Sequence, residues 1–312
     1  MAQSLNLVFC GTPRFAVPTL ERLLAAGSVV SAVVTQPDKP KGRGLELAPS
    51  PVKARALELG LQIAQPEKIK NNPEFQSHLS ALNPDAIIVV GYGRMIPPWM
   101  LDLPRYGNIN LHASLLPKYR GAAPIQWAIA RGESVTGVTT MRIDSGLDTG
   151  DILLQKQVAI TPEDTADSLS PRLATVGAEL VIETLRGLQA GNIQPCPQDG
   201  AKASLAPVLR KEDGRIDFHR TAEEIYNRLR GFQPWPGAFT TFRGKTLQVW
   251  ITKFAELRVA PGELAVQNDR LFAGCGESTA LELCEVQPEG KKRMPARDFV
   301  HGYHPATGEK LG

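Results

Sequence analysis

The sequence predicts an α/β fold, in which a doubly wound, mostly parallel sheet is followed by a small β-barrel. In the first half, short and nearly unbroken apolar segments alternate with helical ones, which is typical of parallel strands covered on both faces. In the last third, short strands are separated by Gly-rich turns, which is typical of small barrels. A length of 312 residues is compatible with two such domains.

The elements of the first half follow from apolar runs and from the glycines that end them. Gly11 ends the first apolar run and Gly27 closes the first helical segment. "DAIIVVG" is apolar throughout, as a central strand should be. We predict strands at 5–10, 29–34, 85–91 and 107–112, and helices at 12–27, 49–60 and 123–132.

In the second half, the sequence pattern changes first from strands and a long helix to a linker, and then to a helix and short strands. Two strands, 138–143 and 152–160, precede a long helical segment that begins at Asp164 or Thr165 and has Gly191 past its end. Residues 191–207 are poor in large hydrophobic side chains and are interpreted as a linker. A helix with the Thr221/Glu224 capping-box spacing and a hairpin about Arg243-Gly244 open the barrel. The predicted domains are therefore residues 1–190 and 208–312, with 191–207 between them.

Composition excludes several classes of function. A hydrophobic fraction of 42% and a net charge of +3 describe an ordinary globular chain, so nucleic-acid binding would have to rest on local patches. No apolar run approaches the roughly 20 residues that span a bilayer, and the first residues do not resemble a signal peptide. The four cysteines lack C-x-x-C spacing, so no metal site is predicted. We expect a cytoplasmic monomer.

One strand carries a polar pair at its end. In "NINLH", Asn110 and His112 are two residues apart and share one face of the strand. The carboxyl ends of strands in such sheets form the ligand-binding edge. An amide and an imidazole that converge there suit an acyl carbonyl, because both can donate hydrogen bonds to a developing oxyanion. A solvent-facing strand end is the alternative.

Three further loops are candidates for the site. "DSGLDTGD" does not fit a calcium loop, and it is either a solvated turn or the source of a carboxylate that orients His112. Residues 36–53 hold Lys39, Lys41 and Arg43, and form either a solvated connection or a basic loop that closes on a phosphate-bearing substrate. "GYGRM" follows an apolar strand, where backbone groups beside Met95 could bind the edge of a flat heterocycle. The first strand-to-helix turn, "FCGTPRF", does not signal a dinucleotide site.

These segments together resemble the folate-dependent formyltransferase family. "NLHASLLPKYRGAAPIQWAI" and "GLDTGDIL" place Asn110, His112 and Asp148 on the family's Asn, His and Asp positions, with Asp148 38 positions after Asn110. "TQPDKPKGRG", "FQPWPGAFT" and "PEGKKRM" are similar to the members that act on initiator tRNA. The resemblance runs from about residue 5 to about residue 300.

The resemblance implies a Rossmann-like catalytic domain and an OB-like barrel. It implies that 10-formyltetrahydrofolate donates a formyl group to the α-amine of methionyl initiator tRNA for translation initiation, without a metal or a covalent enzyme intermediate. The folate would lie near Arg94, Met95, Ile96, Ser114, Leu115, Leu116 and Pro117. The tRNA would contact Lys39, Lys41, Arg43, Arg210, Lys211, Lys291 and Lys292, and Arg210 would replace a lysine often found where this chain has Val208.

Two other functions are compatible with the same fold. A formyltransferase acting on an amino-sugar nucleotide or another small amine would be fully active without tRNA. A non-catalytic RNA-binding protein on a Rossmann scaffold would tolerate His112→Ala. Both alternatives are open to direct assay.

Overall fold

The computed structural model describes residues 4–41 and 46–312, the side chains of Lys41 and Glu46 excepted. By their contacts, residues Met1–Pro124, Val135–Ala159 and Ser170–Pro207 form one compact unit. Ile125–Ser134, Ile160–Leu169 and Val208–Gly312 form the other. Segment 191–207 thus packs with the first unit, and two short segments before residue 190 pack with the second. That residues 1–190 and 208–312 are separate domains joined by a linker at 191–207 stays a prediction.

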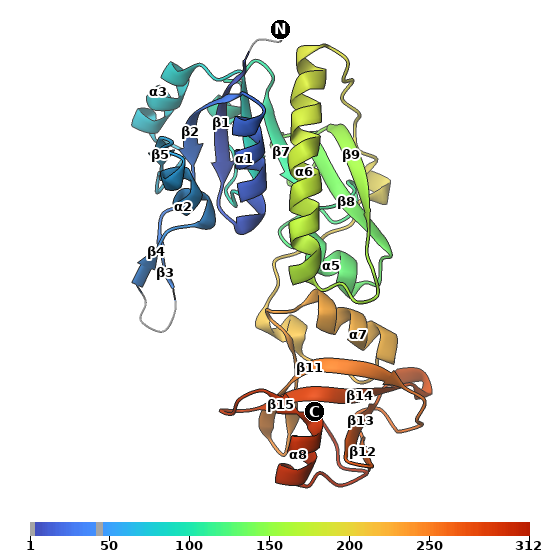
Figure 1. The fold of residues 1–312 in the computed structure, drawn as a ribbon. Coiled ribbons are helices and arrows are strands. Elements are labelled where there is room, and N and C mark those ends of the chain that lie inside the picture. The colour runs from blue at the N-terminus through green and yellow to red at the C-terminus, as the bar shows by residue number, and fades with distance from the viewer. Residues whose placement is uncertain (1–3, 42–45) are drawn as a thin grey trace. The chain divides into compact units, whose positions relative to one another are not determined.

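The first unit is built on a seven-stranded sheet with the order β5-β2-β1-β6-β7-β8-β9 (Figure 1). The first five strands in this order are parallel, whereas β8 is antiparallel to both β7 and β9. The predicted mostly parallel, doubly wound sheet is confirmed. Its strands are β1 (Asn6–Gly11), β2 (Val29–Val34), β5 (Ile63–Ala64), β6 (Ala86–Val90), β7 (Asn108–His112), β8 (Val135–Arg142) and β9 (Ile152–Ala159).

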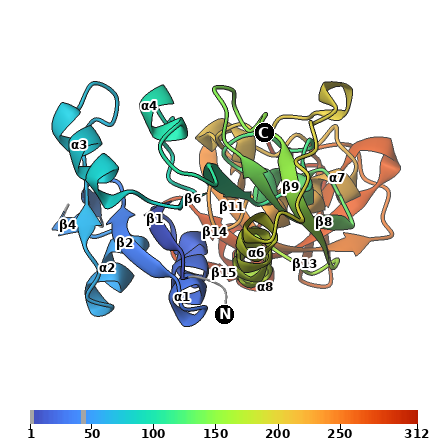
Figure 2. The same ribbon diagram turned by 90° about the horizontal axis from the view of Figure 1, so that it is seen from above.

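Helices cover both faces of this sheet. Figure 2 shows α1 and α6 on one face and α3 and α4 on the other. Phe75 and Leu79 of α3 and Met100 of α4 are buried in one cluster with Val8 and Ile87 of the strands. These helices are α1 (Val17–Ala25), α2 (Pro51–Glu58), α3 (Pro73–Leu82), α4 (Pro98–Leu101) and α6 (Ala166–Gln189), with 3-10 turns at Arg14–Ala16 and Gly200–Lys202. A small hairpin, β3 (Lys39–Lys41) and β4 (Glu46–Ala48), stands apart from the sheet.

The order of the strands creates a switch point between β1 and β6. The chain moves from β1 outward to β2 and β5, and returns to place β6 on the other side of β1. Ligands of doubly wound sheets bind at the carboxyl ends of the strands beside such a point. The loops after β1, β2 and β6 meet here, because Thr12 and Gln36 both donate to the Tyr92 carbonyl, through the Thr12 hydroxyl at 3.4 Å and the Gln36 amide at 2.8 Å.

The second unit is an antiparallel sheet with the order β10-β11-β14-β13-β12, in which β15 also pairs with β14. Residues near the C-terminus bridge both edges of the sheet, because Phe242 pairs with Leu311 and Glu263 pairs with Lys310. The predicted small barrel and its hairpin at Arg243-Gly244 are confirmed. The strands are β10 (Ala238–Phe242), β11 (Lys245–Ala255), β12 (Leu264–Gln267), β13 (Arg270–Gly274), β14 (Ala280–Pro288) and β15 (Met294–Pro295).

Helices of the second unit complete its core. The capping box that opens α7 is formed as predicted: the Glu224 amide donates to the Thr221 hydroxyl, and the Thr221 amide donates to the Glu224 carboxylate. Phe299 of α8 is fully buried against the sheet. The helices are α5 (Pro124–Ala130), α7 (Ala222–Gly231) and α8 (Ala296–Tyr303), with 3-10 turns at Lys211–Gly214 and Gly276–Ser278. No described helix is long and apolar enough to cross a membrane.

Candidate active site

Strand β7 holds Asn110 and His112 on the sheet face that points away from α6. Leu111 lies between them and points to the other face, where Gly177 of α6 approaches closely. A Cβ at position 177 would lie 2.7 Å from a Leu111 methyl, so a glycine is what lets the helix pack against β7. The apolar contact at Leu111 therefore fixes where the polar pair points. Asn110 is half-buried and His112 is only 6% exposed.

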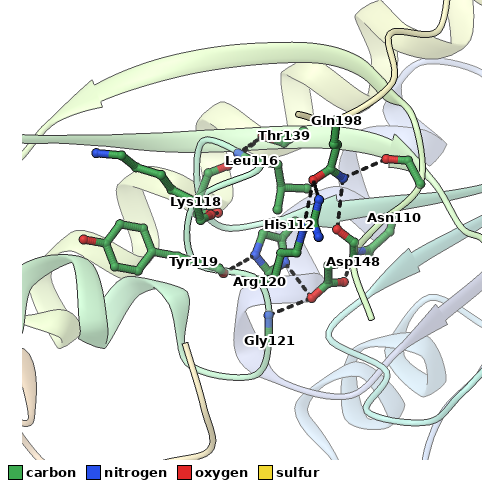
Figure 3. A network of polar contacts seen from close by, with 12 residues as sticks. Asn110, His112, Leu116, Lys118, Tyr119, Arg120, Gly121, Thr139, Asp148 and Gln198 are labelled. Atoms are coloured by element: carbon green, nitrogen blue, oxygen red, sulfur yellow. Dashed lines mark hydrogen bonds and ion pairs between the residues drawn. The ribbon is translucent and has the colours of Figure 1, made fainter. Parts of the chain in front are cut away.

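The loop between β8 and β9 carries Asp148 back to this polar pair (Figure 3). Its two carboxylate oxygens face different partners: Oδ1 lies 3.5 Å from the Asn110 amide nitrogen and Oδ2 lies 3.6 Å from His112 Nδ1. Oδ2 also accepts a 2.8 Å hydrogen bond from the Gly121 amide. The structure thus brings Asp148 to the two other predicted catalytic residues, Asn110 and His112, from more than 30 positions away in the sequence.

The His112 ring lies between two oxygen acceptors. Nε2 is 2.8 Å from the Tyr119 carbonyl, which can only accept, so Nε2 carries a hydrogen. Nδ1 faces the Asp148 carboxylate at an ion-pair distance. Only the doubly protonated ring could donate to both sides, so a proton that arrives at Nδ1 would be held next to a negative charge.

The loop after β7 is held in place by polar contacts within the loop and with β8 and β9. The Thr139 hydroxyl donates to the Ser114 carbonyl at 2.6 Å and accepts from the Leu116 amide at 3.2 Å. The Ser114 hydroxyl donates to the Lys118 carbonyl at 2.6 Å, and Gln155 donates to the Leu116 carbonyl at 2.9 Å. Ser114 and Leu116, two of the residues predicted to bind folate, are buried and stabilise the loop itself.

The loop after β6 is the more open of the two predicted folate-binding segments. Gly91 and Gly93 have φ of 56° and 73°, left-handed values that glycine adopts readily. Met95 is 80% exposed, whereas Ile96 is buried in the core. The Arg94 guanidinium donates to the Glu67 carbonyl. This loop therefore presents an exposed apolar side chain and backbone groups at the switch point.

Sequence reasoning missed Gln198, which contacts the Asp148 loop, and Arg120, which holds Gln198. Gln198 donates from Nε2 to the carbonyls of Asp148 and Gly150, at 2.9 and 2.7 Å. Its Oε1 accepts from Arg120 Nε and Nη2, at 3.0 and 2.8 Å. Gln198 lies in the segment predicted to be a linker, and no periodicity in that segment signals a contact with a site 50 residues earlier.

The small hairpin carries the predicted basic loop, of which Arg43 lies outside the described residues. Lys39 is on β3 and exposed. At the base of the hairpin, Asp38 accepts from Lys53 at 2.6 Å and from Gln65 at 2.8 Å. The hydrogen bond from Lys53 and then that from Gln65 lower the pKa of Asp38, so this carboxylate stays ionised at neutral pH.

The remaining predicted RNA-binding residues, Arg210, Lys211, Lys291 and Lys292, lie exposed on the second unit. In the run Lys291-Lys292-Arg293, the arginine and the two lysines differ in their contacts. Arg293 forms an ion pair with Glu285, and its guanidinium lies over the Trp250 ring at 5.0 Å. Lys291 and Lys292 instead extend from the turn between β14 and β15, where a phosphate could reach them.

The environment of Cys10 and the arrangement of possible metal ligands bear on thiol and metal chemistry. Cys10 is fully buried beside the first ligand-edge turn, and burial raises the pKa of its thiol, so it stays a protonated and unreactive core residue. Among residues 4–41 and 46–312 there is no group of three or more His, Cys, Asp or Glu side chains that could hold a metal ion.

A doubly wound domain with Asn, His and Asp at one site, followed by a small barrel, matches a known class of enzyme. The chain belongs to the formyl transferase family: the formyl transferase domain matches residues 5–185, and the C-terminal domain of formyl transferases matches residues 208–304. It is accordingly an enzyme of the one-carbon group transferase type.

Relatives place the chain more closely within the family. It is 65% identical over 306 residues to the methionyl-tRNA formyltransferase of Koribacter versatilis, with 98% of each chain covered. It is 61% identical to that of Acidobacterium capsulatum, over 99% of this chain and 100% of the relative. These matches confirm the resemblance seen in the sequence. A sugar 3N-formyltransferase, WlaRD, solved in the presence of dTDP and 5-N-formyl-THF, shares the fold with a TM-score of 0.65 at 18% identity, over 93% of this chain and 100% of that one.

Proposed function

We propose that the enzyme transfers the formyl group of 10-formyltetrahydrofolate to the α-amine of methionyl initiator tRNA. The product, N-formylmethionyl-tRNA, serves translation initiation in the cytoplasm. The convergence of Asp148, from the loop between β8 and β9, on Asn110 and His112 at the end of β7 is the observation that carries this proposal. The high identity to two methionyl-tRNA formyltransferases over nearly the whole chain supports the choice of substrate.

The reaction forms a bond between the methionine nitrogen and the formyl carbon, and breaks the bond from that carbon to the folate nitrogen. A model α-amino group titrates at about 7.7–8.0, so a useful neutral fraction is available to attack. Attack produces a tetrahedral intermediate whose oxyanion Asn110, and His112 when protonated, would stabilise. Asp148 would hold the imidazolium and assist transfer of the amine proton to the leaving nitrogen, through water.

The folate would bind where the loops after β6 and β7 meet the carboxyl ends of the sheet. Met95 offers apolar surface there, and the backbone of residues 94–96 offers donors and acceptors for a flat heterocycle. Ser114 and Leu116 would act by shaping the wall rather than by reaching the ligand, because both are buried. The folate supplies an activated one-carbon unit, so the chemistry needs neither a metal nor a covalent enzyme intermediate.

The tRNA would be held by basic residues at separate places in the chain. Lys39, Lys41 and Arg43 would sense the unpaired end of the acceptor stem, because proteins distinguish RNAs mainly at unpaired bases. Arg210, Lys211, Lys291 and Lys292 would bind phosphates and provide affinity that falls with salt. We propose that the enzyme works as a monomer.

A formylation assay tests the substrate. With 10-formyltetrahydrofolate as donor, methionyl initiator tRNA, methionyl elongator tRNA and small amines, including an amino-sugar nucleotide, are compared as acceptors at equal concentrations. We expect rapid transfer only to the charged initiator tRNA. Transfer to small amines without transfer to the initiator would contradict the proposal.

A further inference from the structure

Residues 198–206, named here the strap, run alongside the loop that follows β7. Ser204 accepts twice from that loop: its carbonyl accepts from the Arg120 amide at 2.8 Å, and its hydroxyl accepts from the Tyr119 amide at 3.0 Å. The Ala206 amide donates to the Arg120 carbonyl at 2.7 Å, and the Ala123 amide donates to the Ala206 carbonyl at 3.2 Å. The strap thus pairs with the loop as a short additional strand would.

The Tyr119 side of the strap fixes one partner of His112. Tyr119 has φ of 63°, a left-handed value that is uncommon for a residue with a bulky side chain. Its amide is anchored by Ser204, and its carbonyl accepts the His112 Nε2 hydrogen. An unusual backbone conformation that is held from both sides sets the direction of the imidazole.

The Gln198 side of the strap fixes the other partner. The Gln198 side-chain amide uses its full hydrogen-bonding capacity. Its Nε2 donates to the Asp148 and Gly150 carbonyls, and its Oε1 accepts two hydrogen bonds from Arg120. Because a guanidinium only donates, Arg120 dictates that Oε1 faces it and that Nε2 faces the carbonyls. Asp148 itself has φ of 52°, and its carbonyl is held directly by this amide (Figure 3).

We propose that Gln198 and Arg120 are positioning residues that hold the Asp148 loop in its reactive geometry, and that the strap is part of the active site rather than a linker. The inference rests on the proposed role of Asp148. The strap holds both acceptors that flank His112, so a loosened strap would displace the carboxylate and the imidazole together. Misplacement of reacting groups by about 1 Å can cost about 100-fold in rate.

Two substitutions separate the positioning role from packing. Gln198→Ala removes all four hydrogen bonds. Gln198→Glu keeps the size of the side chain and its pairing with Arg120, but it turns a carboxylate oxygen toward the Asp148 and Gly150 carbonyls, which also only accept. We expect both variants to lower kcat about 10- to 100-fold, with KM for folate and for methionyl-tRNA changed less than threefold. Gln194→Ala, at an exposed glutamine four residues earlier, is the matched control and should keep the wild-type kcat.

A double-mutant cycle with Asp148→Ala shows how Gln198 acts. Gln198 donates to the backbone carbonyls of residues 148 and 150, and these hydrogen bonds do not need the Asp148 side chain. Gln198→Ala should therefore lower the unfolding temperature equally in the wild-type enzyme and in Asp148→Ala. Single-turnover rates should instead fall much less on Gln198→Ala when Asp148 is absent than when it is present, because the main effect of Gln198 passes through the Asp148 carboxylate. Two outcomes would overturn this inference alone. One is an equal fractional loss of rate on Gln198→Ala with and without the Asp148 side chain. The other is a wild-type kcat in both Gln198 variants together with a slow Asp148→Ala. Wild-type kcat in Asp148→Ala would overturn the proposed role of Asp148 and this inference with it.

Discussion

At the scale of single residues, the sequence period indicates how some side chains of the site are oriented, but it does not reveal the contacts between distant residues. The period of two along β7 predicts that Asn110 and His112 share a face, and the structure places them so. Asp148 was predicted through a resemblance in motif, because a loop gives no pattern from which its fold-back could be inferred. Gln198 was missed, since its role depends on one amide that bridges two distant loops.

Asn110→Ala should lower kcat about 100- to 1,000-fold, the usual cost of losing one donor to an oxyanion. KM for methionyl-tRNA should change little, because the lost hydrogen bond forms mainly in the transition state. Steady-state kinetics under saturating folate measures both values. Asn192→Ala, at an exposed position, serves as the control. A fall in kcat of less than threefold would remove Asn110 from the mechanism.

Gly121→Ala should both destabilise the enzyme and slow it. Gly121 has φ of 121°, and a Cβ there would lie 2.6 Å from the Ala206 carbonyl oxygen, so the strap would be pushed away from the Asp148 site. Gly60→Ala is the matched control, since Gly60 also has positive φ but has open space around a Cβ. We expect a lower melting temperature in both variants, at a cost of about 1–3 kcal/mol each, and a kcat reduced about 10-fold or more only in Gly121→Ala. Equal kcat in the two variants would show that the close approach has no catalytic importance.

At the scale of elements, the strands with unbroken apolar runs were predicted well and the short connecting elements were not. Gly11 and Gly27 mark the ends of β1 and α1 closely, because a glycine at such a point is a local signal. The helices α3 and α4 were not predicted, since only part of each short segment is apolar. The sequence also does not reveal that β8 runs antiparallel to β7, because strand direction is decided by pairing between distant residues.

The base of the β3–β4 hairpin offers a test at this scale. Asp38→Asn should weaken the ties to Lys53 and Gln65 and leave the hairpin less fixed, and we expect KM for methionyl-tRNA to rise about threefold while KM for folate is unchanged. The pKa of Asp38 is lowered in the folded enzyme, so its stabilising contribution is complete at neutral pH and is lost as pH falls through the folded-state pKa. Glu58→Gln, which weakens an exposed ion pair with Arg55, should leave both KM values at the wild-type level. An unchanged KM for tRNA in Asp38→Asn would separate the hairpin from RNA binding.

At the scale of the whole molecule, the sequence predicted the two kinds of fold and their order along the chain. The family matches at residues 5–185 and 208–304 agree with that order. What the sequence does not show is that residues 125–134 and 160–169 pack with the C-terminal unit, because those contacts join residues far apart in the chain. Arg230 makes some of them, donating to the carbonyls of Thr161 and Asp164 at 3.1 and 3.0 Å. The predicted monomer stays a prediction.

Salt dependence tests the contribution of the second unit to tRNA binding. The double variant Lys291→Ala, Lys292→Ala should weaken methionyl-tRNA binding and reduce the slope of log Kd against log salt concentration by about 1 for each lysine that neutralises a phosphate. Lys245→Ala, at another exposed lysine of the same unit, should leave the slope unchanged. A slope equal to that of the wild type in the double variant would exclude both lysines from the RNA-binding surface.

The single-turnover rate of formyl transfer by His112→Ala tests most directly whether the Asn110–His112–Asp148 site carries out the chemistry. The variant is saturated with 10-formyltetrahydrofolate and mixed with methionyl initiator tRNA, with tRNA binding measured separately. We expect wild-type tRNA binding and a transfer rate lowered at least about 100-fold, because both the donor to the oxyanion and the partner of Asp148 are lost. Transfer at the wild-type rate would contradict the assignment of this site to the chemistry.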